Sequence, residues 1–118
     1  MADQGLFIGF GFPVRGREEA ATKVFGELLG MLGAQMQQGN VVSFEPAFIQ
    51  PHGGELGGFV LARGDRSKLD ALVASQEFQR LMTRAQTIVE HFGVVNCFFG
   101  EELQRQVGSF IPDTADLR

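Results

Sequence analysis

The chain lacks two of the three large aromatic residue types. Its 118 residues include 12 Phe but no Trp and no Tyr. Phenylalanine has no polar tip, so the core can be aromatic although the aromatic side chains that often orient a ligand by hydrogen bonding are absent. A reaction that needs a Tyr or Trp side chain is therefore excluded.

Cysteine and net positive charge are also scarce. The single cysteine, Cys97, excludes an intrachain disulfide and a metal site built from several cysteines, and it fits a reducing compartment. The net charge is −4, with acids and bases interspersed, so the basic stripe that drives binding to nucleic acid is missing. We therefore expect no nucleic-acid partner, no metal site and no cofactor.

Long apolar runs are missing as well, because no segment approaches the ~20 apolar residues of a membrane-spanning helix. The N-terminal stretch GLFIGFGFPV precedes its first basic residue, Arg15, whereas a secretory signal has the opposite order. We therefore expect a cytoplasmic protein without a membrane partner. A hydrophobic content of 44% with 20% charge indicates one globular domain over residues 1–118.

The first part of the chain is predicted to form a strand and a long helix. Apolar residues alternate over 5–12, which is typical of a strand, and Pro13 ends it. Over 16–39 apolar residues recur at three- and four-residue steps, which indicates an amphipathic helix. Glycines inside this helix leave room either for a small ligand or, as the simpler interpretation, for a close contact with another helix. They are Gly26, Gly30 and Gly33.

Two further strands are predicted as a hairpin. They cover residues 41–50 and 55–63, and the segment PHGG between them is short and rich in glycine. If Gly53-Gly54 is a two-residue turn, Phe48 lies opposite Phe59, so apolar residues meet across the pair.

The last part of the chain is predicted to hold two capped helices, a fourth strand and a short final helix. Asp65 and Ser75 are the expected N-terminal caps. The expected ranges are 65–74, 76–92 and 101–107 for the helices and 94–99 for the strand. The tail 108–118 contains a Pro and two Asp and is predicted to be irregular.

The order βαββαβ predicts an α+β, ferredoxin-like fold, in which an antiparallel four-stranded sheet carries its helices on one face. The usual strand order, 4-1-3-2, places Pro46 on an outer strand, where its missing N–H is tolerated. The expected core spans about residues 5–107.

The face without helices should also be apolar. In the last strand Val94 and Phe98 lie on one face, and Val95, Cys97 and Phe99 lie on the other. A wet face would be polar at every second residue, and an exposed apolar face of this size marks an interaction site. We therefore expect a homodimer in which the open sheet faces of two copies pack together.

With this element order, and with the segment KLDALVASQEFQRLMTRAQTIVEHFGVVNCFF, the chain resembles the dimeric α+β barrel superfamily over about residues 5–107. The resemblance implies a homodimer with two sheets face to face, and often a pocket between each sheet and its own helices. The superfamily includes haem-degrading and polyketide monooxygenases, muconolactone isomerases and small stress-related proteins without a known reaction. Fold alone does not choose among these functions.

The two histidines are the candidate catalytic residues. His52 could shuttle protons beside a pocket, or it could be a solvated turn residue among glycines. His91 is placed at the end of the predicted helix 76–92, where the helix dipole alone would favour a protonated histidine. It resembles the helix histidine that ligates haem in the haem degraders. Those enzymes also rely on a Trp, which is absent here, and on an Asn, whereas Asn96 lies on the last strand.

Other residues are candidates for lining a ligand site. They are Gly9, Gly11, Glu45, Arg63 and Asn96. Glycines inside a strand leave room either for a small apolar ligand or for a closely packed partner sheet. The three polar residues lie within strands, and Arg63 could pair with an acidic ligand or simply reach water.

Three functional hypotheses follow. The first is a homodimeric module that binds a small, mostly apolar molecule or stabilises a partner without catalysis. The alternatives are a cofactor-independent monooxygenase or isomerase of the superfamily, and a haem-binding protein that uses His91. The missing Tyr and Trp and the few acid–base groups favour the first. A ligand pocket takes roughly 300–1,000 Å³, so a cavity below ~100 Å³ would count against a pocket.

Overall fold

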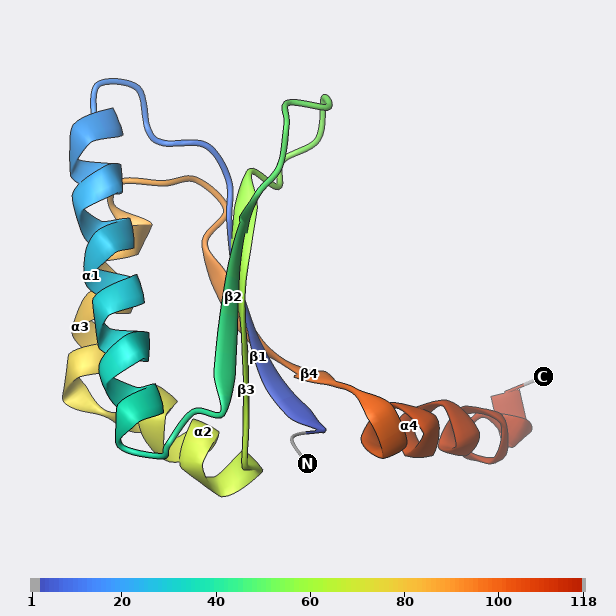
Figure 1. Ribbon diagram of the computed structural model, residues 1–118. Coiled ribbons are helices and arrows are strands. Elements are labelled where there is room, and N and C mark those ends of the chain that lie inside the picture. The colour runs from blue at the N-terminus through green and yellow to red at the C-terminus, as the bar shows by residue number, and fades with distance from the viewer. Residues whose placement is uncertain (1–2, 118) are drawn as a thin grey trace.

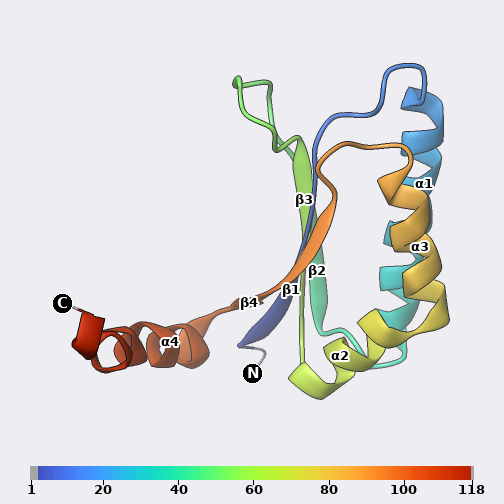
Figure 2. The same ribbon diagram turned by 180° about the vertical axis from the view of Figure 1, so that it is seen from behind.

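One face of a four-stranded antiparallel sheet is covered by helices in the computed structural model, which describes residues 3–117 (Figures 1 and 2). The strands are β1 (Gln4–Phe10), β2 (Ser43–Phe48), β3 (Gly58–Gly64) and β4 (Gly93–Phe98). The helices are α1 (Glu18–Gln37), α2 (Arg66–Ala74), α3 (Gln76–Gln86), α4 (Gly100–Asp113) and the short 3₁₀ helix η1 (Ala115–Leu117). The strand order β2-β3-β1-β4 confirms the ferredoxin-like plan and the edge position of Pro46.

The alternation of β1 sorts its side chains between the two faces of the sheet. Leu6 and Ile8 point towards the helices and are buried. Phe7 lies on the other face, opposite Leu61 of β3 and Val95 of β4. The predicted strand is confirmed as far as Phe10, where the paired segment ends.

The predicted register of the hairpin is wrong by one residue. Ala47 lies opposite Phe59, and Phe48 lies opposite Gly58. Gly53-Gly54 is not a two-residue turn, because the ladder closes with a 2.9 Å hydrogen bond from the Ile49 N–H to the Gly57 carbonyl and a longer loop follows. A one-residue slip moves every side chain to the opposite face, and the observed register turns Phe48 towards the helices.

The predicted helix 76–92 is also too long. Ser75 caps α3 as expected, because its Oγ accepts a 3.2 Å hydrogen bond from the Phe78 N–H. The helix ends at Gln86, however, because the following residues pair with the chain after β1. The Val14 N–H donates to the Ile88 carbonyl at 2.8 Å, and the Glu90 N–H donates to the Phe12 carbonyl at 3.0 Å.

The final helix is longer than predicted, and the expected irregular tail is wrong. α4 runs through Gly108 and Pro112 to Asp113, and η1 follows it. The sequence reason is an apolar stripe at positions 103, 107 and 110, which continues the helical period across the glycine. A glycine in a helix costs about 1 kcal/mol relative to alanine, and that cost did not stop the helix here.

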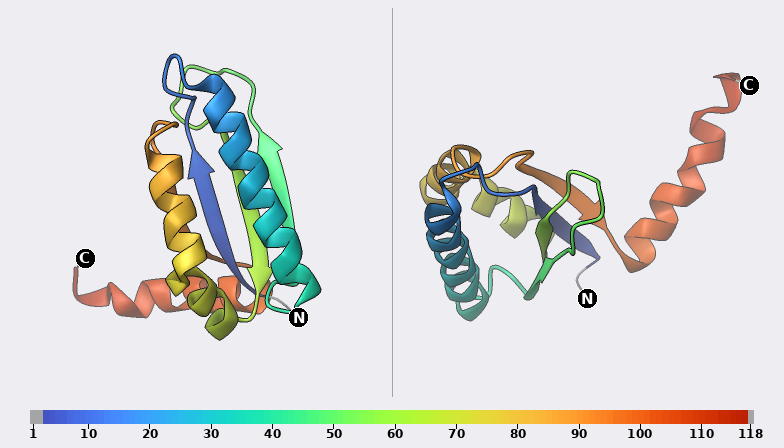
Figure 3. Two further views of the ribbon diagram at one scale, coloured as in Figure 1. Left: turned by 90° about the vertical axis from the view of Figure 1, so that its left-hand side faces the viewer. Right: turned by 90° about the horizontal axis from the view of Figure 1, so that it is seen from above.

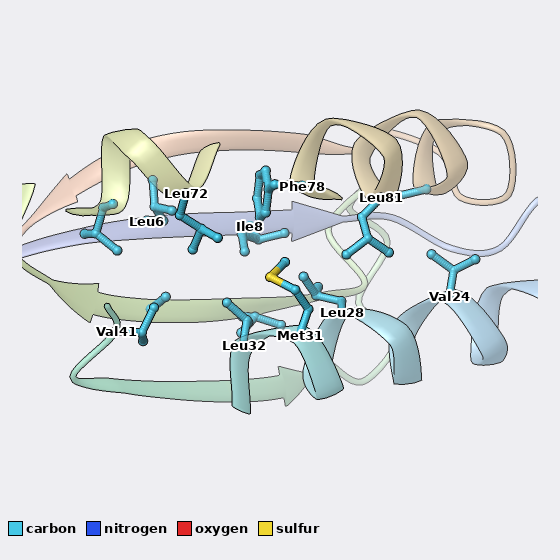
Figure 4. Close-up of a cluster of buried hydrophobic side chains, with 14 of the residues drawn as sticks. Leu6, Ile8, Val24, Leu28, Met31, Leu32, Val41, Leu72, Phe78 and Leu81 are labelled. Atoms are coloured by element: carbon cyan, nitrogen blue, oxygen red, sulfur yellow. The ribbon is translucent and has the colours of Figure 1, made fainter. Parts of the chain in front are cut away.

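The core lies between the sheet and the helices α1, α2 and α3, and the two longer helices lie side by side over the strands (Figure 3). Figure 4 shows side chains from the sheet and all three helices meeting in one layer. They include Leu6, Ile8, Leu28, Met31, Leu32, Leu72, Phe78 and Leu81. On the outer side, Arg84 donates to both carboxylate oxygens of Glu27 at 3.0 and 2.9 Å and joins α3 to α1.

The glycines inside α1 do not mark a close contact within the chain, so that interpretation is wrong. A Cβ added at Gly26, Gly30 or Gly33 would meet no atom within 4 Å. We therefore expect Gly30→Ala to raise the free energy of unfolding by about 0.5–1 kcal/mol, because glycine costs helix stability without a packing gain. Urea unfolding measures this change. Gly39→Ala is the control and should lower stability, because Gly39 has a φ of +82°. A loss of stability for Gly30→Ala would show that this helix face is covered by another molecule.

Candidate functional site

A cavity of about 450 Å³ lies between the sheet and the helices α1 and α3. Its volume falls within the range of ligand pockets, roughly 300–1,000 Å³. The lining comes from the strands, both helices and the segments that connect them: Ile8, Phe10, Gly11, Phe12, Pro13, Ala21, Thr22, Val24, Phe25, Leu28, Phe48, Ile49, Gly57, Phe78, Leu81, Met82, Ala85, Ile88, Val89 and Phe92.

Three aromatic rings form one wall of the cavity. Phe25 of α1 lies 5.1 Å from Phe48 of β2 and 5.7 Å from Phe10 of β1, measured between ring centroids. The Phe10 ring lies close over Gly58, its neighbour on β3, which has no side chain; a Cβ there would be 2.7 Å from the ring. The observed hairpin register produces this cluster, because that register turns Phe48 towards α1.

The lining is almost entirely apolar. Among the described residues that line the cavity, Thr22 alone has a polar side chain, and none is titratable. The backbone N–H groups of the two glycines in the lining are already paired, because the Gly11 N–H donates to the Glu90 carbonyl at 2.7 Å and the Gly57 N–H donates to the Phe10 carbonyl at 2.8 Å. Burying an unpaired charge here would be costly. The cavity therefore suits a neutral, apolar molecule and offers no side chain for acid–base chemistry.

Both histidines lie outside this lining. His91 does not end a helix as predicted; it lies in the loop before β4 with a φ of +55°. Its Nε2 is 3.4 Å from a carboxylate oxygen of Glu55, and both side chains are mostly exposed. His52 is exposed at the tip of the hairpin loop, with its Nδ1 3.2 Å from the Gln50 carbonyl oxygen. Their catalytic roles stay predictions.

Of the two candidate glycines, Gly11 reaches the cavity and Gly9 does not. A Cβ on Gly11 would lie 2.7 Å from the Glu90 carbonyl oxygen and 2.9 Å from that of Glu55. The missing side chain therefore lets the backbone at Gly11 pass close to the backbone at Glu55 and at Glu90. A Cβ on Gly9 would lie 2.5 Å from the ring of Phe7. The space over Gly9 is therefore filled by the chain's own side chain.

The candidate polar residues lie elsewhere on the sheet. The Arg63 guanidinium stacks on the Phe99 ring, 3.6 Å from its centroid, on the face without helices. Glu45 lies on that same face, opposite Leu61, and is exposed. Asn96 is exposed on β4. None of the three lines the cavity, and a role in ligand binding stays a prediction for each.

The face without helices, which we call the open face, is mainly apolar. Phe7 and Phe59 stack there with ring centroids 5.4 Å apart. Val95 is 59% exposed. Burial raises the pKa of the nearby Cys97 thiol, although the positive charges of Arg63 and Arg66 act in the opposite direction. The thiol therefore stays protonated near neutral pH, which makes it a poor nucleophile.

The aromatic cluster of the cavity was not predicted from the sequence. Phe10, Phe25 and Phe48 come from three different elements, and each looked like an ordinary member of its own apolar stripe. A usable signal was present in Gly58, since a glycine inside a strand can mark a close approach.

In the described part of the chain, no group of three His, Cys, Asp or Glu side chains is placed to hold a metal ion. No helix of residues 3–117 is both long and apolar enough to cross a membrane.

Comparison with known proteins shows similarity of fold. No protein-family model and no curated protein sequence matches the chain. Among solved structures, a Nitrosomonas europaea protein of unknown function, NE2512, is 19% identical with a TM-score of 0.62 and matches over 84% of this chain and 90% of its own. A dimeric ferredoxin-like protein of unknown function from Jannaschia sp. CCS1 is 13% identical with a TM-score of 0.60, over 82% and 98% of the two chains.

A third similar structure, from Chloroflexus aurantiacus J-10-fl, carries the provisional name antibiotic biosynthesis monooxygenase. It is 12% identical with a TM-score of 0.51, over 80% of this chain and 91% of its own. At these identities the comparisons establish the ferredoxin-like fold and nothing beyond the fold.

Proposed function

We propose that this protein is a homodimeric module that binds a small, mostly apolar molecule in the cavity between its sheet and helices. The observation that carries the proposal is the apolar cavity of about 450 Å³. Protein interiors are packed as densely as organic crystals, and few of their voids exceed a water molecule. A space of this size leaves its lining without contact partners, and a bound apolar molecule would supply them.

The open face supports the dimer. Its apolar surface lies on the side of the sheet that no helix covers and comes from Phe7, Phe59, Leu61 and Val95. Solved neighbours described as dimeric share the fold. A two-fold dimer that packs the two open faces together would remove this surface from water. The single half-buried thiol, Cys97, fits the reducing conditions of the cytoplasm.

Binding is favoured over catalysis by the character of the lining. A cofactor-independent monooxygenase or isomerase would still need a group that takes a proton from its substrate, and the described lining offers the hydroxyl of Thr22 and no titratable side chain. For haem, the expected ligand His91 is paired with Glu55 outside the lining. The proposal therefore assigns the cavity to binding.

Ala21→Phe tests the proposal, because it places a ring into the cavity from α1. We expect the protein to bind the neutral probe N-phenyl-1-naphthylamine, with enhanced probe fluorescence, and we expect Ala21→Phe to weaken this binding at least ~10-fold, the effect of losing about 1.4 kcal/mol of binding free energy.

Ala71→Phe is the matched control, since Ala71 is exposed on α2 and does not line the cavity. It should leave probe binding unchanged, and circular dichroism should show both variants folded. Equal binding by the two variants, or no binding by the original protein, would contradict the proposal. Native mass spectrometry of protein purified from its own host would measure the mass of any molecule that occupies the cavity.

A further inference from the structure

Helix α4 stands away from the rest of the molecule, on the side of the sheet opposite α1 and α3 (Figures 1 to 3). None of its fourteen residues, all within the described part of the chain, is buried. Isolated helices shorter than ~12–15 residues are marginal in water, and helices in proteins gain most of their stability from packing an apolar face. The helix therefore needs a surface to pack against.

The sequence of α4 supplies an apolar face. Leu103, Val107 and Phe110 follow one another at four- and three-residue steps and are 48%, 65% and 67% exposed. The opposite side of the helix is polar, and there Arg105 pairs with Glu102 at 2.6 Å. This division is typical of a helix that packs on another surface along one side.

The base of α4 is fixed to the open face. The Phe99 ring lies over Gly5, where a Cβ would be 2.6 Å from the ring, and the Arg63 guanidinium covers the ring from outside. The Phe99 N–H donates to the Asp3 carbonyl at 2.8 Å. Gly100 then turns the chain away from the sheet with a φ of +53°. The helix therefore leaves from the open face itself and points away from its own sheet.

The open face alone is small for a stable interface. Four strands spaced ~4.8 Å apart and about six residues long cover roughly 400 Å², whereas a stable interface takes about 800 Å² from each partner. A helix of 14 residues is ~21 Å long and ~10 Å wide, so one side of it covers roughly 200 Å². In a two-fold dimer each copy gives one such helix and receives one, which brings the contact to the required size.

We propose that α4 is an arm that packs its apolar face, Leu103, Val107 and Phe110, on a second copy of this chain. Packed sheets lie ~10 Å apart, so a helix that leaves the open face must run beside the copy that covers this face. This inference rests on the proposed dimer and adds to it a contact outside the two sheets.

A pair of double variants tests the arm in the full chain. Val107→Asp with Phe110→Asp adds two negative charges to the apolar face, and Gln104→Asp with Ser109→Asp adds the same charges to other sides of the same helix. Sedimentation velocity should show the dimer dissociation constant raised at least ~10-fold by the first pair, because charges in a desolvated contact are costly, and within about two-fold of the original for the second.

A photo-crosslinker placed at position 107 identifies what the arm contacts. A benzoylphenylalanine there should link covalently to a second chain, and mixing isotope-labelled with unlabelled protein distinguishes links between chains from links within one. Links only within the chain, or binding of the original protein to phosphatidylglycerol vesicles that the first pair abolishes, would overturn the arm. If Val95→Asp dissociated the dimer while both double variants left it intact, the arm would be overturned and the dimer would stand. A monomeric original protein would overturn the dimer and the arm together.

Discussion

Phe78→Ala is expected to lower the free energy of unfolding by about 3–5 kcal/mol, the range for truncating a buried Phe in a packed core. Phe78 is 1% exposed and lies in the first turn of α3, against the central strand β1 and the helix α1. The substitution removes a ring from the layer that joins sheet to helices and enlarges the adjoining cavity. Urea unfolding at one fixed protein concentration measures the change, because dimerisation adds to apparent stability.

Phe48→Ala is the control for this result. Phe48 is 74% exposed, although its ring lies 5.1 Å from that of Phe25. An aromatic pair contributes about 0.5–1.5 kcal/mol beyond its area, so we expect a loss of about 1 kcal/mol. If Phe78→Ala cost no more than Phe48→Ala, the assignment of Phe78 to the core would be wrong.

Val95→Asp is expected to dissociate the proposed dimer. Val95 is exposed on the open face and lies opposite Phe7 of β1. A carboxylate at this position would be buried without a partner when two open faces meet, and leaving a buried charge unpaired costs about 2–5 kcal/mol. We therefore expect the dissociation constant, measured by sedimentation velocity, to rise by a factor of ~30 or more.

Asn96→Asp is the matched control, because it adds the same charge one residue further along β4, on the other face of the strand. The dissociation constant should stay close to the original. The fold itself should survive both substitutions, since both side chains are exposed in the single chain. If Val95→Asp stayed as dimeric as Asn96→Asp, the open face would not be the dimer interface.

Local patterns predicted most of the fold. The alternation in β1, the three- and four-residue steps in α1 and the cap at Ser75 each depend on residues close together in the chain. Their order then predicted the ferredoxin-like plan, and the missing N–H of Pro46 predicted its place on an outer strand. One of the errors falls where a distant segment competes. The end of α3 was misplaced because residues 88–90 pair with the chain after β1, far away in sequence.

The candidate site was predicted less well than the fold. The sequence singled out strand glycines and polar residues, and of these Gly11 alone lines the cavity. Gly9 makes room for Phe7, and Arg63 covers Phe99 on the open face. A glycine in a strand predicts that something approaches closely, but the approaching group comes from tertiary packing.

The sequence by itself determined the order of the elements, the two apolar faces of the sheet and the absence of Tyr and Trp from any site. These depend on composition and on periods of two and 3.6 residues, which each segment carries alone. Only the tertiary structure decided that Phe10, Phe25 and Phe48 meet beside an apolar cavity and that α4 leaves from the open face. A cavity and a direction in space arise from the distances between elements, and no single segment encodes them.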